Sequence, residues 1–177
     1  DGTCLGAAYH VWHEILGREE RFHMKHAFWG PEYSDEQIRK VAEKSSFLVK
    51  NCKDHGELID EASTLLSKGL VVGWYQGRSE WGPRALGNRS ILADPSVKDM
   101  KNIINSKIKR RESFRPFAPS VLKEDVSTYF EQDVDSPFMM HVVKVKEKWQ
   151  KRLPAITHVD GTGRLQTVDK ESNSLYY

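Results

Sequence analysis

Hydrophobic residues in the first 70 positions recur three and four residues apart, the spacing of one helical face. The pattern predicts a helix over residues 3–16, ended by Gly17. A second helix is predicted from Ser34 to about residue 44, because Ser34 and Gln37 have the types and spacing of a capping box. A third helix is expected over 54–68.

The rest of the chain mixes short apolar runs with turn residues and helical stretches. Residues 18–33 show no periodicity and contain Gly30-Pro31, so a linker or an extended wrap is expected there. The apolar run at 70–75 predicts a buried strand, and Pro83 predicts one turn of helix over 83–86. The same pattern predicts strands at 90–93, 118–122, 139–145 and 163–168, and helices at 97–108, 123–130 and 146–151. Strands that alternate with helices indicate an α/β sheet.

Charge adds to this picture because it is unevenly placed. The 177 residues carry 27 Lys and Arg against 25 Asp and Glu, a formal net charge of +2. Residues 78–89 hold three arginines against one glutamate, and residues 101–115 hold six basic residues against one glutamate. Positive charge gathered on two segments of an otherwise neutral-to-acidic chain indicates a local anion site. An RNA-binding module is the main alternative, since a basic patch near aromatic residues also suits RNA.

Arg84 is the strongest candidate for binding an anion. It follows Gly82 and Pro83 in a glycine-containing turn that comes soon after a predicted strand. A planar guanidinium matches the geometry of phosphate and carboxylate, and glycine lets the backbone approach a ligand closely. The alternative is a structural arginine that bridges the loop to a carboxylate. Arg78 and Arg89 are candidates to contact the ligand or to support the residues that do.

The second basic segment offers Lys109 and Arg115. A basic run of this kind is also typical of a solvated face. Arg115 stands among apolar neighbours, between Phe114 and Pro116, so we expect it to be partly buried. A buried charge needs a partner, either a protein carboxylate or a ligand phosphate. Arg111 is expected to pair with the adjacent Glu112 within the protein.

Arg164 and His158 lie in the last predicted turn and strand. Arg164 follows a turn-rich stretch, where an exposed hairpin arginine is the alternative to a ligand contact. His158 is a candidate base or hydrogen-bonding group, although a lone histidine is more often structural. Glu80 is expected to orient one of the arginines of residues 78–89.

Other features narrow the class of protein. No apolar run approaches 18 residues and no signal sequence is evident, so we expect a cytoplasmic protein with no membrane partner. Cys4 and Cys52 form no CxxC motif and indicate neither a disulfide framework nor a zinc knuckle. Two pairs of histidines at three-residue spacing lack an added carboxylate at ligand spacing and are interpreted as surface residues.

Three segments carry a family resemblance. Residues 78–89 (Arg-Ser-Glu-Trp-Gly-Pro-Arg-Ala-Leu-Gly-Asn-Arg), 108–119 and 158–168 resemble, in this order, the signatures of the NodU/CmcH family of O-carbamoyltransferases. Residues 1–8 and 29–34 also resemble family sequence. The resemblance covers nearly the whole chain, and its long motifs are far more specific than a single short glycine motif.

The resemblance implies a domain organisation. Residues 1–33 would be the tail of a TsaD-like N-terminal domain with a linker, and residues 34–177 a YrdC-like C-terminal domain. The implied fold is α/β (α+β), a twisted mixed sheet with flanking helices. The family continues into an Asn-Thr-Ser-Phe-Asn segment that this sequence lacks, so we expect the C-terminal domain to be truncated and weakly active or inactive alone.

The resemblance also implies a reaction and its ligands. Carbamoyl phosphate and ATP would give carbamoyl-adenylate, whose carbamoyl group then passes to a hydroxyl acceptor in the TsaD-like domain. Mg²⁺ as a companion of ATP and a homodimer are left open, and no nucleic acid is expected. Asp1 matches a metal-binding aspartate of the intact two-domain enzyme, where Fe²⁺ or another divalent metal would also need histidines from the N-terminal domain. The residues that the resemblance assigns to the substrates are Arg78, Arg84, Lys109, Arg115 and Arg164, with His158 as a weaker candidate.

Overall fold

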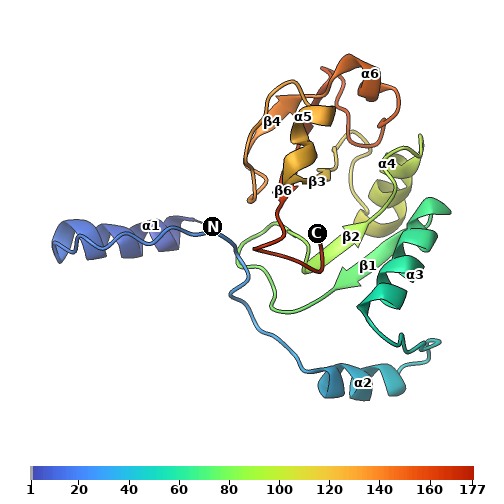
Figure 1. The fold of residues 1–177 in the computed structure, drawn as a ribbon, viewed down its shortest axis with the longest axis horizontal. Helices are drawn as coiled ribbons and strands as arrows, with labels where there is room; N and C mark the ends of the chain where they lie inside the picture. The colour runs from blue at the N-terminus through green and yellow to red at the C-terminus, as the bar shows by residue number, and fades with distance from the viewer. Residues whose placement is uncertain (1) are drawn as a thin grey trace.

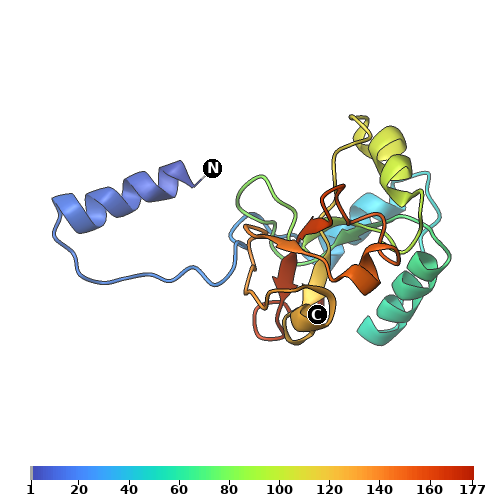
Figure 2. The ribbon, with the colours of Figure 1, turned by 90° about the horizontal axis from the view of Figure 1, so that it is seen from above.

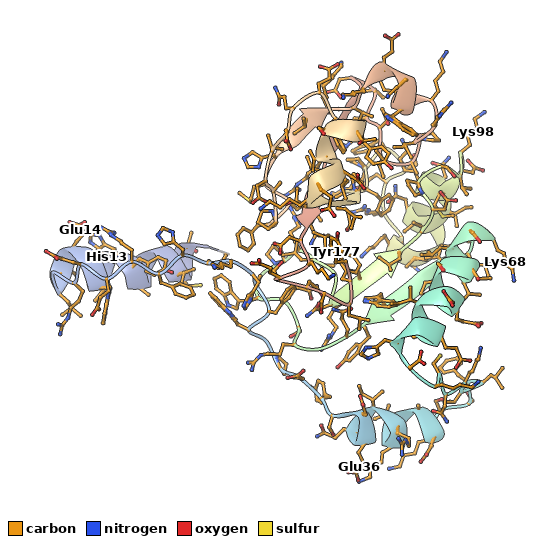
Figure 3. The ribbon with its side chains drawn as sticks, viewed as in Figure 1. His13, Glu14, Glu36, Lys68, Lys98 and Tyr177 are labelled. Carbon is orange, nitrogen blue, oxygen red and sulfur yellow. The ribbon has the colours of Figure 1, made fainter. Side chains whose placement is uncertain are left out.

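The first helix stands apart from the rest of the molecule. The computed structural model describes residues 2–177, and in it α1 (Thr3–His10) continues as a π-helical turn over Val11–Ile15. The predicted helix at 3–16 is thereby confirmed, ending near Gly17 as expected. Both ribbon views show α1 projecting away from the body (Figures 1 and 2). His13 and Glu14 lie far from the remaining side chains in Figure 3, and no residue of the helix is buried.

The next segment returns to the body without regular structure, as expected for residues 18–33. It docks on the molecule at its far end, where Gly30 N donates to Ser79 O at 2.9 Å and Ser79 N donates to Pro31 O at 3.0 Å. An added Cβ at Gly30 would lie 2.0 Å from Ser79 Oγ, so only glycine allows this approach. The extended wrap therefore lies directly against the start of the arginine-rich loop.

Two helices follow, and their starts agree with the sequence pattern. α2 (Asp35–Glu43) begins with the predicted capping box, in which Ser34 Oγ accepts from Gln37 N and Gln37 Oε1 accepts from Ser34 N. α3 (His55–Ser67) is capped by Asp54, whose carboxylate accepts from Glu57 N at 2.9 Å. α3 lies beside the first strand (Figure 1).

The first strand is less buried than its apolar sequence predicts. β1 (Val72–Tyr75) pairs in antiparallel register with β2 (Arg89–Leu92), and Tyr75 faces Arg89. Leu70 is 50% exposed and Tyr75 48% exposed, so the expectation of a buried strand is wrong, although a strand does form. The reason is that β1 has a single partner strand among the described residues and α3 covers only part of its surface.

The C-terminal half is built from short elements. These are α4 (Met100–Ile103) with a π-helical turn (Ile104–Lys109), β3 (Ser120–Leu122), a 3₁₀ turn (Lys123–Asp125), α5 (Val126–Tyr129), β4 (Val142–Lys144), α6 (Glu147–Gln150), β5 (Thr162–Arg164) and β6 (Gln166–Val168). β3 pairs with β6 in parallel, and β4 pairs with β5 in antiparallel register. Among residues 2–177 the strands thus form three two-stranded sheets, a mixed α/β arrangement.

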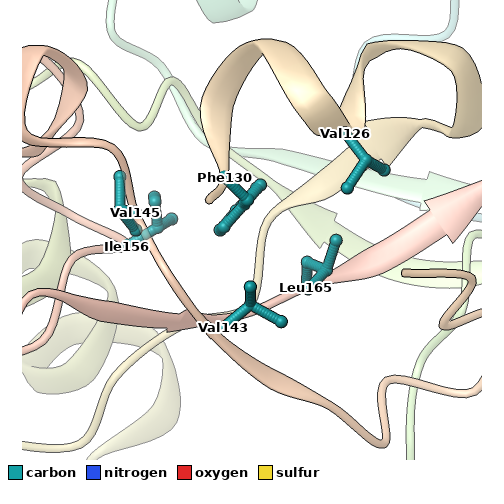
Figure 4. Packing of buried hydrophobic residues seen from close by; sticks show 6 residues of the cluster. All are labelled: Val126, Phe130, Val143, Val145, Ile156 and Leu165. Atoms are coloured by element: carbon teal, nitrogen blue, oxygen red, sulfur yellow. The ribbon is translucent and has the colours of Figure 1, made fainter. Parts of the chain in front are cut away.

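The strand predicted at 163–168 is divided in two. β5 pairs with β4 and β6 pairs with β3, so the chain changes partner at Leu165. Leu165 is 0% exposed and belongs to the larger core cluster, shown in Figure 4, together with Val126, Phe130, Val143, Val145 and Ile156. The buried leucine holds the crossing point in place. A smaller cluster of Met100, Ile104 and Ala155 lies beside α4.

The helical turn predicted over 83–86 does not form. Residues 81–84 are bends and 85–86 have no regular structure. Gly82 and Gly87, on either side, have φ angles of +110° and +111°, which a helix does not allow. The loop is shaped by these two glycines and not by Pro83.

Candidate anion-binding site

A cavity of about 740 Å³ lies between the arginine-rich loop, the basic segment after α4, and the strands β3, β5 and β6. Its wall includes apolar residues of α4 and of the smaller core cluster. Its cations come from three separate parts of the chain and are Arg84, Lys109, Arg111, Arg115 and Arg164. We call this space the cationic cavity. Four of these five residues are those that the sequence assigns to the ligand.

The loop that carries Arg84 is held by Glu80. One carboxylate oxygen, Oε1, accepts from the backbone N–H groups of Leu86 at 2.7 Å, Asn88 at 2.8 Å and Arg89 at 3.2 Å. Glu80 therefore orients the backbone of the loop and not an arginine side chain, contrary to the prediction. Arg84 itself is exposed and has no hydrogen bond or ion pair with a residue in 2–177. The alternative, in which Arg84 bridges the loop to a carboxylate, is therefore wrong for the described residues.

Arg78 and Arg89 bind backbone carbonyls that hold the loop in shape, and they do not face the cavity. Arg78 donates to the carbonyls of Gly30 and Trp29 at 3.1 and 3.2 Å, which fastens the wrap to the loop. The Arg89 guanidinium lies 3.6 Å from the ring centroid of Tyr75 and donates to the carbonyls of Gln76 and Gly77. Neither arginine lines the cationic cavity.

The basic segment turns sharply where its helix ends. The π-helical turn ends at Lys109, and the next residue, Arg110, is in the left-handed region with φ 48°. Lys109, just before it, is exposed, lines the cavity and has no hydrogen bond or ion pair within the described part of the chain. Arg111, just after it, also lines the cavity. The sequence pattern did not mark Arg111 as a ligand residue.

Arg115 pairs with a protein carboxylate while facing the same cavity. Its Nε lies 3.0 Å from Glu112 Oε2, and the two side chains are 54% and 55% exposed. The prediction that apolar neighbours bury Arg115 is wrong, because Phe114 is itself 76% exposed. The predicted Arg111–Glu112 pair is also wrong. A hydrogen bond from its own backbone N–H and the nearby Arg115 guanidinium lower the pKa of the Glu112 carboxyl, which keeps the pair ionised.

Arg164 reaches the cavity from β5. It is half-buried, and its Nε donates to the carbonyl of Met139 at 2.7 Å. Met139 has φ 58° and lines the cavity as well. Gln166, two residues later, donates to Leu86 O at 2.9 Å and so ties β6 to the arginine-rich loop. The alternative of an exposed hairpin arginine is therefore wrong, because Arg164 is half-buried and fixed at one nitrogen.

His158 is not among the residues that line the cavity. Its backbone N–H donates to Thr162 O at 2.8 Å and its carbonyl accepts from Gly161 N at 2.9 Å, which closes the turn before β5. Its Nδ1 lies 3.3 Å from Thr162 Oγ1, and its Nε2 is buried without a partner in the described residues. These contacts place His158 in the turn that leads to Arg164.

The C-terminal residues complete the cavity wall. Tyr176 lines it, and its hydroxyl lies 2.7 Å from Ser120 Oγ. Its ring packs on Gly87, where an added Cβ would be 2.5 Å from Tyr176 Cδ1. Burial raises the pKa of the Tyr176 phenol, which keeps it protonated. Local pattern offered no signal for Tyr176, because its partners are 56 and 89 positions away.

The metal was expected only in the intact two-domain enzyme, on Asp1 and histidines of the N-terminal domain. Asp1 lies outside the described residues. Within residues 2–177 no group of three or more His, Cys, Asp or Glu side chains is placed to hold a metal ion. The described residues therefore do not fit a divalent metal site, and no chemistry is assigned to one.

The sequence matches a family model described as the C-terminus of carbamoyltransferases over residues 63–177. The match includes the loop of Arg84, the basic segment and Arg164, and so contains all the cations of the cavity. The chain belongs to the carbamoyltransferase C-terminus family.

Individual relatives agree with this membership. Nodulation protein NolO of Bradyrhizobium diazoefficiens is 44% identical over 179 residues, which include 99% of this chain and 33% of the relative. Nodulation protein NolNO of Sinorhizobium fredii is 43% identical over 182 residues, 99% of this chain and 26% of the relative. The 3'-hydroxymethylcephem-O-carbamoyltransferase of Amycolatopsis lactamdurans is 46% identical over 114 residues, 64% of this chain and 21% of the relative.

This carbamoyltransferase C-terminal region spans about a third or less of the relatives named above. The domain boundary expected near residue 33 stays a prediction. None of the helices in residues 2–177 has the length and apolar character needed to cross a bilayer.

Proposed function

We propose that the cationic cavity binds carbamoyl phosphate and ATP and is the place where carbamoyl-adenylate forms. The observation that carries this proposal is the convergence of Arg84, Lys109, Arg115 and Arg164 on one cavity, although they lie up to 80 positions apart in the sequence. Arg84 and Lys109 have no protein partner in the described residues, so their charges are available to a ligand. Membership of the carbamoyltransferase C-terminus family supports the choice of ligands.

The proposed reaction brings two polyanions together. Carbamoyl phosphate and water give carbamate and phosphate, and a carbamate oxygen then attacks the α-phosphorus of ATP and displaces pyrophosphate. Mutual repulsion of the reactants is a large part of such a barrier, and fixed cations reduce it while holding the attacking oxygen and the phosphorus in line. The role of these residues is positioning and charge neutralisation, with no side-chain nucleophile. Mg²⁺ would be a companion of the nucleotide.

The second step of the proposal concerns the complete enzyme. The carbamoyl group would pass from the adenylate to a hydroxyl acceptor held by a TsaD-like domain outside this chain. The proposal includes a YrdC-like fold for residues 34–177, supported by the mixed α/β arrangement and the family membership. The isolated chain is expected to bind the substrates but to turn over weakly or not at all.

Calorimetric titration of this chain with ATP, and separately with carbamoyl phosphate, tests the proposal. Replacing Arg84 by Ala should weaken binding of at least one ligand by about tenfold or more, because a hydrogen bond to a charged group contributes about 1.5–3 kcal/mol. Lys98→Ala is the matched control, since Lys98 is exposed near α4, lies outside the cavity and also removes one positive charge.

Two results would contradict the proposal. One is a folded wild-type chain that binds neither ligand, and the other is an Arg84→Ala variant that binds both as tightly as the wild type. Binding of single-stranded RNA that weakens steeply with salt and competes with ATP would favour the RNA-binding alternative instead.

A further inference from the structure

Arg111 is a cavity cation that the proposed function does not use. It lines the cationic cavity and is half-buried. Its guanidinium carbon lies 4.9 Å from the ring centroid of Phe117, another residue of the cavity wall. No ion pair joins Arg111 to a carboxylate in residues 2–177, because the nearby Glu112 pairs with Arg115 instead. Its charge is therefore uncompensated by a direct partner.

Asn105 fixes the orientation of Arg111. It is 0% exposed, and its Oδ1 accepts from Arg111 Nε at 2.7 Å. Its Nδ2 donates to Arg115 O at 2.9 Å and to Ser113 O at 3.3 Å, and its backbone carbonyl accepts from Arg111 N at 3.0 Å. One buried amide thus organises the whole turn from 105 to 115. A side chain held at Nε and placed over a ring has lost most of its rotational freedom before any ligand arrives.

The remaining donors of Arg111 have little to bind in the protein. Nη2 has only a long contact of 3.5 Å to Pro116 O, and Nη1 donates to no atom of the described residues. Two η nitrogens of one guanidinium form a fork that matches two oxygens of a phosphoryl group. A lysine at this position would keep the charge but would lose the fork, the Nε hydrogen bond and the planar guanidinium over the Phe117 ring.

We propose that Arg111 is a further phosphoryl-binding residue of the cationic cavity and that Asn105 is the residue that positions it. The proposal rests on the proposed function, since it places Arg111 on a phosphoryl group of carbamoyl phosphate or of ATP. Arg111 then differs in kind from Arg84 and Lys109, whose side chains make no hydrogen bond or ion pair within residues 2–177. It is a preoriented anchor, whereas those two are free to adjust to the substrate.

The test compares Arg111→Lys with Arg110→Lys in this chain. Arg110 is the adjacent residue, is exposed, lies outside the cavity and has no side-chain partner in the described residues. Both variants keep the net charge and make the same chemical change. Calorimetric titration with ATP, carbamoyl phosphate and inorganic phosphate should show at least about tenfold weaker binding for Arg111→Lys. Arg110→Lys should bind like the wild type.

The three ligands distinguish the two sources of the phosphoryl group. If Arg111→Lys loses affinity for carbamoyl phosphate and inorganic phosphate, Arg111 is assigned to carbamoyl phosphate. If it loses affinity for ATP alone, Arg111 is assigned to the nucleotide. Wild-type affinity of Arg111→Lys for all three overturns the inference, while the proposed function stands if Arg84→Ala still loses binding. A wild-type chain that binds none of the three overturns both.

Asn105 needs a second readout, because a buried amide also supports the fold. The affinity for the affected ligand is measured for Asn105→Ala, Arg111→Lys and the double variant, each first shown to be folded by circular dichroism. If Asn105 acts through Arg111, the Asn105→Ala change should weaken binding much less in the Arg111→Lys background than in the wild type. Equal and additive losses would overturn the positioning role.

Discussion

At the scale of single residues, Glu80 decides what the arginine-rich loop can offer a ligand. Its Oε1 takes the backbone N–H groups of Leu86, Asn88 and Arg89. These amides form a small anion-binding concavity that the protein fills with its own carboxylate. These donors are therefore already satisfied, and under the proposed function a ligand phosphate would be bound by the side chain of Arg84. Gly82 and Gly87 shape this loop through their positive φ angles.

Replacing Glu80 tests this clamp. Glu80→Ala should lower the free energy of unfolding by about 2–3 kcal/mol, since three partly buried N–H groups lose their acceptor. Glu80→Gln keeps an acceptor oxygen and should lose about 1 kcal/mol. Urea unfolding followed by circular dichroism measures both. Glu43→Ala, at an exposed glutamate whose side chain has no hydrogen bond or ion pair in the described residues, should stay within about 0.5 kcal/mol of the wild type. An Ala variant as stable as this control would show that the clamp contributes nothing.

At the scale of elements, the two capped helices have similar ends but different surroundings. α2 has a complete capping box, yet none of its residues is buried. α3 has the simpler Asp54 cap, but Leu58, Leu65 and Leu66 are half-buried and the helix contacts β1. A cap stabilises its own helix. It raises the free energy of global unfolding only when that helix packs against the rest of the molecule.

The two caps therefore predict different consequences. Asp54→Ala should lower the free energy of global unfolding by about 1 kcal/mol, measured by urea denaturation. Ser34→Ala should leave global unfolding unchanged and instead speed amide hydrogen exchange in the first turn of α2. The interpretation fails if Ser34→Ala costs as much global stability as Asp54→Ala does.

At the scale of the whole molecule, the C-terminal segment is a structural part of the cavity. Asn173 Nδ2 donates to Asn88 Oδ1 at 3.0 Å and its Oδ1 accepts from Gln76 Nε2 at 2.6 Å. Tyr176 adds its contact with Gly87. The wrap at 27–31 holds the other side of the same loop. The position of Arg84 thus depends on segments from both ends of the chain.

Gly87→Ala tests this dependence. The residue has φ +111°, and the new methyl group would overlap the Tyr176 ring, so both backbone strain and overpacking oppose the change. Unfolding in urea should show a loss of about 3 kcal/mol. Gly73→Ala is the control, because no atom lies within 4 Å of its added Cβ, and it should be neutral or slightly stabilising. Equal stability of the two variants would mean that the C-terminal segment is not seated on the loop.

The sequence by itself determined two kinds of feature: local helix structure and the motifs that the chain shares with its relatives. The capping box at Ser34 and the helices at 3–16 and 54–68 were predicted because their hydrogen bonds and spacing involve residues within one or two turns. The family was recognisable from long motifs, and four cavity cations were named from it. Short-range backbone hydrogen bonds and family motifs can be recognised from the order of residues alone.

Only the tertiary structure decided which groups act together. The partner change at Leu165, the clamp of Glu80 and the anchoring of Arg111 depend on atoms brought together by the fold. Arg78 and His158 were named with the others but lie outside the cavity for the same reason. A side chain's role depends on its nearest acceptors and on its exposure, and these are set by segments up to about 90 positions away, as with Gly87 and Tyr176.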